Sequence, residues 1–353
     1  MCIALRKRTT EIAKEKKLSY VATKVEQGSI KTLYSIVNEL TDKTKERVLP
    51  TAVNNKKLAD DFLQYFKQKI ETIREKLSSH YCNTFNVSPN PNVEQLSSFT
   101  PTTVEEINEI IANFGIKLSP EDPLPVSVLS SYLDVLVPVW VNIVNLSLKA
   151  GSMDLLKSAV ILPLIKELNS STNTDDFKNY RPISNLVFIS KLIECVVDIR
   201  LQQHLVRNNL QMDQQYGYKK SHSTEMLLLK VVNNLLQSCD KNIPSVVLLL
   251  DLSAAFDTVD HSKLLDILCK DIGITSIALE WFRSFLTNRT QKVKIDEAFS
   301  EIAELLFGVA QGSILGPRLF NIYIRSVYSR MVYTKIEVEG FAADLQLVRQ
   351  YMP

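Results

Sequence analysis

Two aspartates occupy positions in the sequence where a carboxylate could hold a metal ion. Asp251 ends the apolar run 246–250, and Asp344 follows an alternating segment that begins at Ile336. Mg²⁺ takes hard oxygen ligands and usually binds through one or two carboxylates together with substrate phosphates. Two carboxylates from separate segments, held on neighbouring strands, would therefore suit phosphoryl transfer assisted by Mg²⁺.

The residues around each aspartate predict the strand that would position it. Residues 246–250 form a short, wholly apolar run, typical of a strand buried on both faces. Such a run ending in aspartate is common, so this signal is weak by itself. Residues 336–341 alternate in polarity before Asp344, with Leu345 and Leu347 beyond. That pattern predicts a β-hairpin whose tight turn carries Asp344.

Five segments in a fixed order connect these aspartates to a known family. They are NYRPISNLVFISKLIE at 179–194, QQYGYKKSHSTEMLL at 214–228, DLSAAFDTVDH from Asp251, GVAQGSILGPRLFNIY at 308–323 and FAADLQL at 341–347. Together they resemble the reverse transcriptases of LINE-type, non-LTR retrotransposons, in particular the jockey-like branch. The similarity extends from about residue 100 to the end, and residues 57–77 resemble the linker between endonuclease and polymerase in those polyproteins.

The resemblance implies an RNA-directed DNA polymerase with the α+β right-hand fold. The fingers would occupy about 101–240 and a partial palm about 241–353, with a small antiparallel sheet under the two aspartates. A basic helical linker region (1–77) and a flexible connector (78–100) would precede them. An RNA template, a DNA primer and dNTPs are the implied partners, and Mg²⁺ is the implied cofactor.

Roles can be carried over to the residues that match the family motifs. Asp251 matches the first metal-binding aspartate, and Asp344 matches the second member of a pair of adjacent aspartates; both are predicted to be catalytic. Five further residues are predicted to contact substrate. They are Phe256, an aromatic gate against a ribose 2′-hydroxyl; Gln311 and Gly312, in a loop against the incoming nucleotide and template; and Arg181 and Lys219, basic finger residues near triphosphate or template.

The sequence departs from the family pattern at the catalytic pair. Ala343 stands where the first of the two adjacent aspartates is expected, and alanine offers no ligand. Outer partners of metal ligands alone are worth roughly 10–100-fold in affinity or activity, so losing a direct ligand should cost more. The chain also ends at Pro353, nine residues after Asp344. We therefore expect the thumb to be missing, the last strand of the palm sheet to lie at an exposed edge, and catalysis to be lost.

Two alternatives remain open. A residually active RNA-directed DNA polymerase would hold Mg²⁺ through Asp251, Asp344 and substrate phosphates alone. A host-adapted nucleic-acid or protein interaction module would instead use the helices of residues 1–77, with the palm as a scaffold. An apolar stripe along this region needs a partner, either the polymerase body or another chain; its members are Leu58, Phe62, Tyr65, Phe66, Ile70, Ile73 and Leu77.

Composition favours an intracellular protein, nuclear or cytoplasmic, and leaves the oligomeric state open. The 353 residues are 45% apolar and 23% charged, with a net charge of +2. Residues 1–80 carry 17 Lys and Arg against 10 Asp and Glu, so this arm is basic. The five cysteines lack metal-ligand spacing, and no signal peptide is recognisable. Residues 126–150 are the most hydrophobic stretch, but Asp134 and Pro138 interrupt it, which favours a buried helix over a membrane span.

Local patterns predict several helix ends and core residues. Thr103 and Glu106 have capping-box spacing before a helix. Asp257 and Asp260 are expected to begin or cap the helix that follows them. Ser313 is expected to open a helix through Phe320 rather than act as a nucleophile. The tryptophans at 140 and 281 are expected to anchor the core.

Overall fold

The computed structural model divides the chain into two compact units. It describes residues 48–52, 54–78, 89–154, 156–166, 172–333 and 336–350. The first unit comprises residues 1–51 and 167–179, and the second comprises residues 52–166 and 180–353. Within the first unit, the backbone N–H of Thr51 donates to the Asp175 carboxylate at 3.1 Å. The predicted basic helical arm before residue 48 lies outside the described residues.

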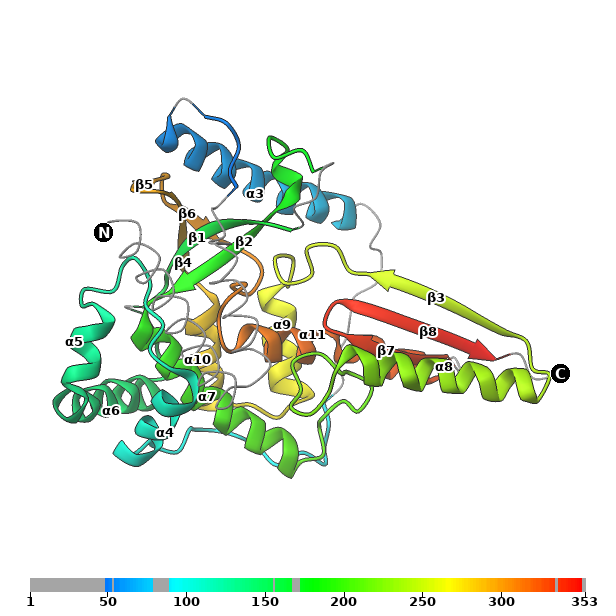
Figure 1. Ribbon diagram of the computed structural model, residues 1–353. Helices are drawn as coiled ribbons and strands as arrows, with labels where there is room; N and C mark the ends of the chain where they lie inside the picture. Colours follow the sequence, from blue (N-terminus) through cyan, green and yellow to red (C-terminus); the bar gives the residue numbers. More distant parts are fainter. Residues whose placement is uncertain are drawn as a thin grey trace, which may run out of the picture. The chain divides into compact units, whose positions relative to one another are not determined.

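The second unit mixes helices with two sheets, as the α+β prediction requires (Figure 1). Its elements in chain order are α3 (Asn55–Ser78), α4 (Val104–Phe114), α5 (Val126–Ser131), α6 (Leu133–Ala150), β1 (Ser158–Ile165), β2 (Tyr180–Leu186), α7 (Phe188–Arg207), α8 (Thr224–Asp240), β3 (Ser245–Asp251), α9 (His261–Lys270), α10 (Ser276–Leu286), β4 (Arg289–Ile295), β5 (Ala298–Phe299), β6 (Ala303–Leu305), α11 (Gly316–Tyr333), β7 (Glu337–Phe341) and β8 (Asp344–Gln350).

The larger sheet has the order β2-β1-β4-β5, with β6 also paired to β4. Strands β1 and β4 run parallel, and β1 and β2 run antiparallel. Helix α3 packs against β4 and β5. Phe62 is fully buried there, with its ring 5.1 Å from the ring of Tyr180 on β2. The apolar stripe of α3 therefore finds its partner in the body of the same chain.

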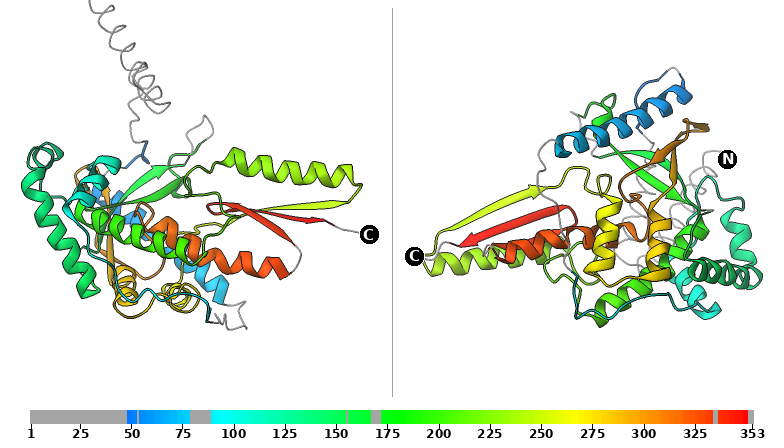
Figure 2. Two further views of the ribbon diagram at one scale, coloured as in Figure 1. Left: turned by 90° about the horizontal axis from the view of Figure 1, so that it is seen from below. Right: turned by 180° about the vertical axis from the view of Figure 1, so that it is seen from behind.

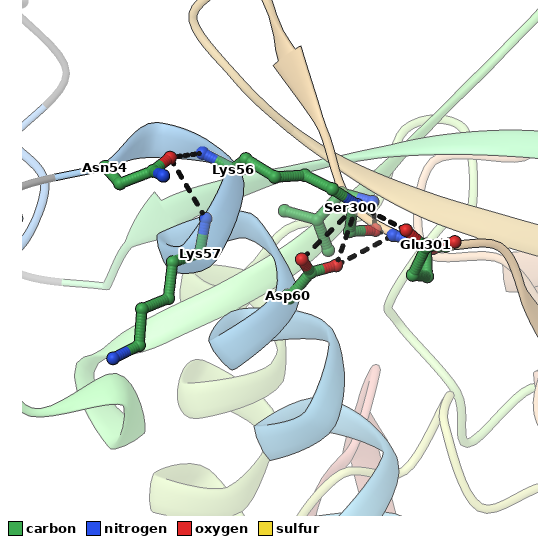
Figure 3. Close-up of polar contacts among 7 residues, drawn as sticks. Asn54, Lys56, Lys57, Asp60, Ser300 and Glu301 are labelled. Carbon is green, nitrogen blue, oxygen red and sulfur yellow. Dashed lines mark hydrogen bonds and ion pairs between the residues drawn. The ribbon is translucent and has the colours of Figure 1, made fainter.

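Polar contacts hold both ends of α3 on this body. At its start, the Lys56 ammonium lies 2.7 Å from Glu301, and the backbone N–H of Glu301 donates to Asp60 at 2.8 Å (Figure 3). At its end, the guanidinium of Arg74 lies 2.8 Å from Asp260 and 3.5 Å from the centre of the Phe307 ring. The helix is thus fixed along its length.

The smaller sheet carries the two aspartates and has the order β3-β8-β7. Helices α8 and α11 lie on opposite faces of this sheet (Figure 2). Leu227 and Val231 of α8 pack with Val348, whereas Leu345 and Leu347 join the main core, to which α11 contributes Tyr328 and other residues. The predicted hairpin and the small antiparallel sheet are confirmed.

Two predictions about this sheet are wrong. Residues 246–250 were expected to be buried on both faces, yet their side chains are 38–71% exposed. The last strand, β8, was expected at an exposed edge, yet it is central and β3 forms the edge. Strand β8 is central because it pairs with β3 on one side and with β7 on the other, and α8 and α11 cover β7 and β8. The exposure of β3 was mispredicted because an apolar run has the same sequence pattern whether or not a neighbour covers it.

The expected helix ends are largely confirmed. The Thr103 hydroxyl accepts the backbone N–H of Glu106 at 3.3 Å and caps α4. The Glu106 carboxylate does not complete a capping box, because it binds Arg200 and Thr102 instead. Asp260 caps α9 by accepting the N–H of Lys263. Trp140 and Trp281 are buried, as expected of core anchors.

Residues 89–100 contact the segment between α9 and α10 and the start of α10. Leu96 forms a parallel bridge with Ile274, and the backbone N–H of Thr275 donates to the Leu96 carbonyl at 2.9 Å. The N–H of Ala278 donates to the Ser97 carbonyl at 3.0 Å. This part of the predicted connector is packed. The domain boundaries themselves stay a prediction.

The hydrophobic stretch 126–150 forms α5 and α6. Helix α6 is long and apolar enough to cross a membrane by length and composition, and about a quarter of it (28%) is buried inside the protein. Val137, Val144 and Leu148 face the core, while the side chains of Val135 and Leu146 are 61% and 66% exposed. The prediction of a buried helix therefore holds for one face only.

Candidate active site

Asp251 and Asp344 lie directly opposite each other in the smaller sheet. Asp251 is the last residue of β3, Asp344 is the first of β8, and the antiparallel register pairs them. Opposite residues of an antiparallel pair project from the same face, with their Cβ atoms about 4.5–5.5 Å apart. Both side chains are exposed. The two predicted ligands are thus presented together at one end of the sheet.

The hairpin turn between β7 and β8 consists of Ala342 and Ala343. Phe341 pairs with Asp344 across it, so Asp344 follows the turn as the first strand residue. The carbonyl of Ala343 accepts the backbone N–H of Leu252 at 3.1 Å, which ties the turn to the end of β3. Ala342 has φ of 55°, in the left-handed region. Ala343 stands in this turn directly before Asp344 and brings only a methyl group where a ligand was predicted.

The side chain of Gln215 holds this turn through hydrogen bonds to the Ala342 backbone. Its amide oxygen accepts the backbone N–H groups of Ala342 at 2.9 Å and Gly217 at 2.8 Å. Its amide nitrogen donates to the Ala342 carbonyl at 3.1 Å and to the Tyr328 hydroxyl at 3.3 Å. Gly217 is required beside it, because a Cβ there would lie 2.3 Å from the Ala342 nitrogen. Motif reading missed Gln215, since its backbone partner is 127 residues away.

Phe256, the predicted gate, is fixed in an aromatic cluster. It is 9% exposed and stacks on Phe320 of α11 with ring centres 4.9 Å apart. The ring of Tyr218 meets it edge-on at 5.9 Å. Burial raises the pKa of Tyr218, and the nearby charge of Arg181 acts in the opposite direction. The predicted role of Arg181 stays a prediction.

The loop of Gln311 and Gly312 lies against β2. The Gln311 carbonyl accepts the backbone N–H of Ser184 at 2.8 Å. Gly312 has φ of 132°, and a Cβ there would lie 2.2 Å from the Ser184 carbonyl oxygen. The Gln311 side-chain oxygen is buried without a hydrogen-bond partner in the part of the chain that the structure describes.

Glu194 anchors the other side of this loop. Its fully buried carboxylate accepts the backbone N–H groups of Ile314 at 2.8 Å and Leu315 at 3.2 Å. Burial raises the pKa of Glu194, and the buried guanidinium of Arg289 acts in the opposite direction. The Ser313 hydroxyl accepts the N–H of Gly316 at 2.9 Å, so Ser313 opens α11, as predicted.

Comparison with known proteins agrees with this arrangement. Residues 170–350 match the family model described as "Reverse transcriptase (RNA-dependent DNA polymerase)". The chain belongs to the reverse transcriptase family. All seven predicted site residues of this reverse transcriptase domain lie within the matched range. The family implies a fold of fingers and palm, and the structure has the mixture of helices and sheets that such a fold requires.

Curated relatives come from non-LTR retrotransposons of Drosophila melanogaster, so the domain is of the LINE type. The chain is 30% identical over 239 residues to "RNA-directed DNA polymerase from mobile element jockey", covering 67% of this chain and 26% of that protein. It is 25% identical over 274 residues to "Probable RNA-directed DNA polymerase from transposon BS", covering 77% and 30%. The chain thus spans less than a third of the length of these relatives.

Lys219 of the reverse transcriptase domain faces a different space from the aspartates. Its ammonium donates to the Met212 carbonyl at 3.4 Å and lies 3.7 Å from Asp213. It lines a cavity of about 510 Å³ between α7 and α11, whose lining includes neither aspartate. The structure therefore pairs Asp251 with Asp344, places Phe256 against Tyr218 and Phe320, and leaves Lys219 in a separate cavity. Its predicted role stays a prediction.

The aspartate pair fits a divalent cation only in part. Two exposed carboxylates on one face match the one or two that Mg²⁺ commonly uses, and substrate phosphates supply further oxygens. Among the described residues, no group of three or more Asp, Glu, His or Cys side chains is placed to hold a metal ion. Any ion at Asp251 and Asp344 would therefore take its remaining ligands from water and from substrate phosphates.

Proposed function

We propose that this chain is a reverse transcriptase domain that binds template and primer but does not add nucleotides. The observation that carries the proposal is the position of Ala343, in the β7–β8 hairpin turn directly before Asp344, which pairs with Asp251 of β3. Two Mg²⁺ ions, when bound, would neutralise charge on the attacking and leaving oxygens. With a methyl group where a third carboxylate is expected, the protein would supply too few ligands to hold both ions.

The other site residues support retained substrate contacts. Phe256 is locked between Phe320 and Tyr218, so a ribose 2′-hydroxyl would meet a ring that cannot move aside. Gly312 lets the loop backbone lie against β2. Arg181, exposed on β2, would face the triphosphate or the template phosphates. An RNA template, a DNA primer and dNTPs are therefore the proposed partners, and the proposed location is intracellular.

Primer extension on an RNA template with Mg²⁺ and dNTPs tests the proposal. We expect no extension by the unmodified chain above the level of Asp251→Ala, and extension by Ala343→Asp. The matched control is Ala342→Asp, which adds the same carboxylate one position earlier in the turn and should not restore activity. Extension by the unmodified chain would overturn the proposal and establish the residually active polymerase.

Absence of primer extension by the Ala343→Asp variant would mean that the missing ligand is not the sole defect. Binding is then decisive: fluorescence anisotropy of a labelled RNA–DNA primer–template should report binding by the unmodified chain. Weaker binding of the primer–template by Arg181→Ala than by the unmodified chain would support a contact between the nucleic acid and Arg181 on β2. Absence of any binding would contradict the proposal.

The interaction-module alternative is weakened for residues 55–78. Leu58, Phe62 and Phe66 of the stripe are buried where α3 packs on the body of the chain, and Phe62 lies against Tyr180, although Leu77 is 48% exposed. That face is therefore not available to a second protein.

A further inference from the structure

Two segments that lie side by side carry several of the predicted site residues. Segment 251–261 begins with Asp251 and contains Phe256, and loop 307–312 contains Gln311. Helix α3, which lies against β4 and β5 of the larger sheet, contacts both of them (Figure 1). This helix precedes the residues that match the reverse transcriptase family. Its contacts with the site are therefore an addition to the family fold.

Backbone hydrogen bonds join the start of the loop to the segment. The N–H of Gly308 donates to the Val259 carbonyl at 2.8 Å. The N–H of Val309 donates to the Phe256 carbonyl at the same distance. The imidazole of His261 donates to the Gly308 carbonyl at 2.7 Å, because a carbonyl can only accept. A displacement of the loop at Gly308 would therefore break its connection to the segment.

Arg74, near the end of α3, bridges the two segments from outside. Its guanidinium lies 2.8 Å from the Asp260 carboxylate and donates to the Thr258 carbonyl at 3.4 Å. It also lies 3.5 Å from the centre of the Phe307 ring, directly before the loop turns into the site. A planar guanidinium can pair with a carboxylate and stack on an aromatic ring at the same time. One side chain thus fixes the start of the loop relative to segment 251–261.

Helix α3 also closes a small cavity beside Gln311. Phe66, Lys69 and Ile70 line it from the helix, and Asp257 and Gln311 line it from the other side. Its volume of about 30 Å³ leaves room for one water molecule. The buried Gln311 oxygen has no hydrogen-bond partner within the described ranges. A water that donates to this oxygen and to the Asp257 carboxyl would satisfy both acceptors, so α3 encloses the space in which Gln311 is held.

We propose that Arg74 is a positioning residue for loop 307–312 and acts through the ring of Phe307. The inference rests on the proposed function, in which this loop contacts the incoming nucleotide and the template. Loss of the guanidinium leaves the ring without its stacking partner and lets the start of the loop move. The hydrogen bonds of Gly308 and Val309 then open more often, and the substrate contacts that follow them weaken.

Hydrogen exchange of the full chain tests the positioning. Arg74→Ala should speed the exchange of the Gly308 and Val309 amides at least tenfold, because the bonds that protect them depend on the position of Phe307. Circular dichroism checks that each variant folds. If Arg74→Ala does not fold, Phe307→Leu takes its place, because it removes the same stacking contact from the other side and should speed the same amides.

Arg200→Ala is the matched control. The guanidinium of Arg200 also combines an ion pair with a bond to a backbone carbonyl: it lies 2.7 Å from the Glu106 carboxylate and donates to the Thr100 carbonyl at 3.2 Å. Both partners belong to α4 and the residues just before it. Exchange at residues 308 and 309 should therefore stay within twofold of the unmodified chain. An increase equal to that of Arg74→Ala would overturn the proposal, because any loss of stability would then loosen the loop.

Arg74→Lys separates the ion pair from the stacking. A lysine keeps a charge for Asp260, but its ammonium cannot lie flat on the ring of Phe307. We expect this variant to melt closer to the unmodified chain than Arg74→Ala does, and yet to keep the faster exchange at residues 308 and 309. Recovery of slow exchange would show that the ion pair is sufficient, and would overturn an action through Phe307.

Binding connects the loop to the substrate. In fluorescence anisotropy with a labelled RNA–DNA primer–template, Arg74→Ala and Phe307→Ala should each raise the Kd at least threefold. The double variant should bind no more weakly than Phe307→Ala alone, because the two residues act as one unit. Additive losses would overturn the action through Phe307, and an unchanged Kd despite faster exchange would overturn the link to substrate.

The two proposals fail in different ways. Absence of primer–template binding by the unmodified chain would contradict the proposed function, whereas the exchange measurements would still decide the role of Arg74. Unchanged exchange of the Gly308 and Val309 amides in Arg74→Ala would overturn the positioning role even if the unmodified chain binds.

Discussion

The side-chain amide of Gln215 and the peptide of Ala342 are joined by two hydrogen bonds, in which Gln215 accepts at 2.9 Å and donates at 3.1 Å. The buried side chain of Gln215 thus binds both the backbone N–H and the carbonyl of Ala342, whose φ lies in the left-handed region. A single αL residue other than glycine costs roughly 1–2 kcal/mol. The Gln215 contacts offset that cost and fix the turn from which Asp344 begins.

Gln215→Leu is expected to destabilise the protein by about 2–4 kcal/mol, because it leaves the N–H groups of Ala342 and Gly217 without their partner. Urea unfolding measures the change. Hydrogen exchange should also speed up at residues 340–346. Gln203→Leu, at an exposed position on α7, is the control and should change little. Normal exchange in the turn of Gln215→Leu would contradict this role.

The meeting of the two aspartates was expected from the chemistry of a metal site and from the resemblance to reverse transcriptases, whereas the hairpin could be predicted from the residues themselves, because alternation and a short turn are local signals. The Gln215 contact could not, since a glutamine in a loop does not reveal which distant backbone it binds. The exposure of β3 was mispredicted for a related reason. Its apolar run shows that a strand forms there, but the presence of a neighbour depends on chain far away in sequence.

The Gly312 position gives a second prediction about the site. Gly312→Ala would place a Cβ 2.2 Å from the Ser184 carbonyl oxygen at a φ of 132°. Gly115→Ala provides the matched control, because Gly115 also has a positive φ, of 69°, but nothing lies within 4 Å of its Cβ. We expect Gly312→Ala to cost at least about 2 kcal/mol more than Gly115→Ala in unfolding experiments. Equal costs would show that the loop can move away from β2.

The two ends of α3 should contribute unequally. Arg74 combines an ion pair with Asp260, a hydrogen bond to the Thr258 carbonyl and stacking on Phe307. Arg74→Ala is therefore expected to cost about 1–3 kcal/mol. Lys56→Ala removes an exposed ion pair with Glu301 and should be indistinguishable from the unmodified chain in thermal unfolding. If Lys56→Ala destabilised the protein more than Arg74→Ala, the start of α3 would contribute more than its end to the packing of this helix on the body.

Asp257 predicts a pH dependence of stability. Burial raises the pKa of this carboxyl to about 6, from 3.8, although the charge of Lys69 acts in the opposite direction. The pKa of Asp257 is higher in the folded than in the unfolded chain, so the folded state is favoured at low pH, where the carboxyl is protonated. This contribution to the free energy of unfolding is lost as the pH rises through about 6. The unmodified chain should therefore lose stability between about pH 4 and pH 7.

Asp257→Asn keeps the shape and removes the charge, so it should be more stable than the unmodified chain at neutral pH. The expected gain is on the order of 2–3 kcal/mol above pH 7 and should shrink towards pH 4. Urea unfolding across this pH range measures the difference. Asp266→Asn, at an exposed position on α9, controls for the loss of a surface carboxylate. A gain in unfolding free energy of the same size at pH 4 and pH 7 would contradict this prediction. It would show that the effect of Asp257→Asn does not arise from titration of the buried carboxyl.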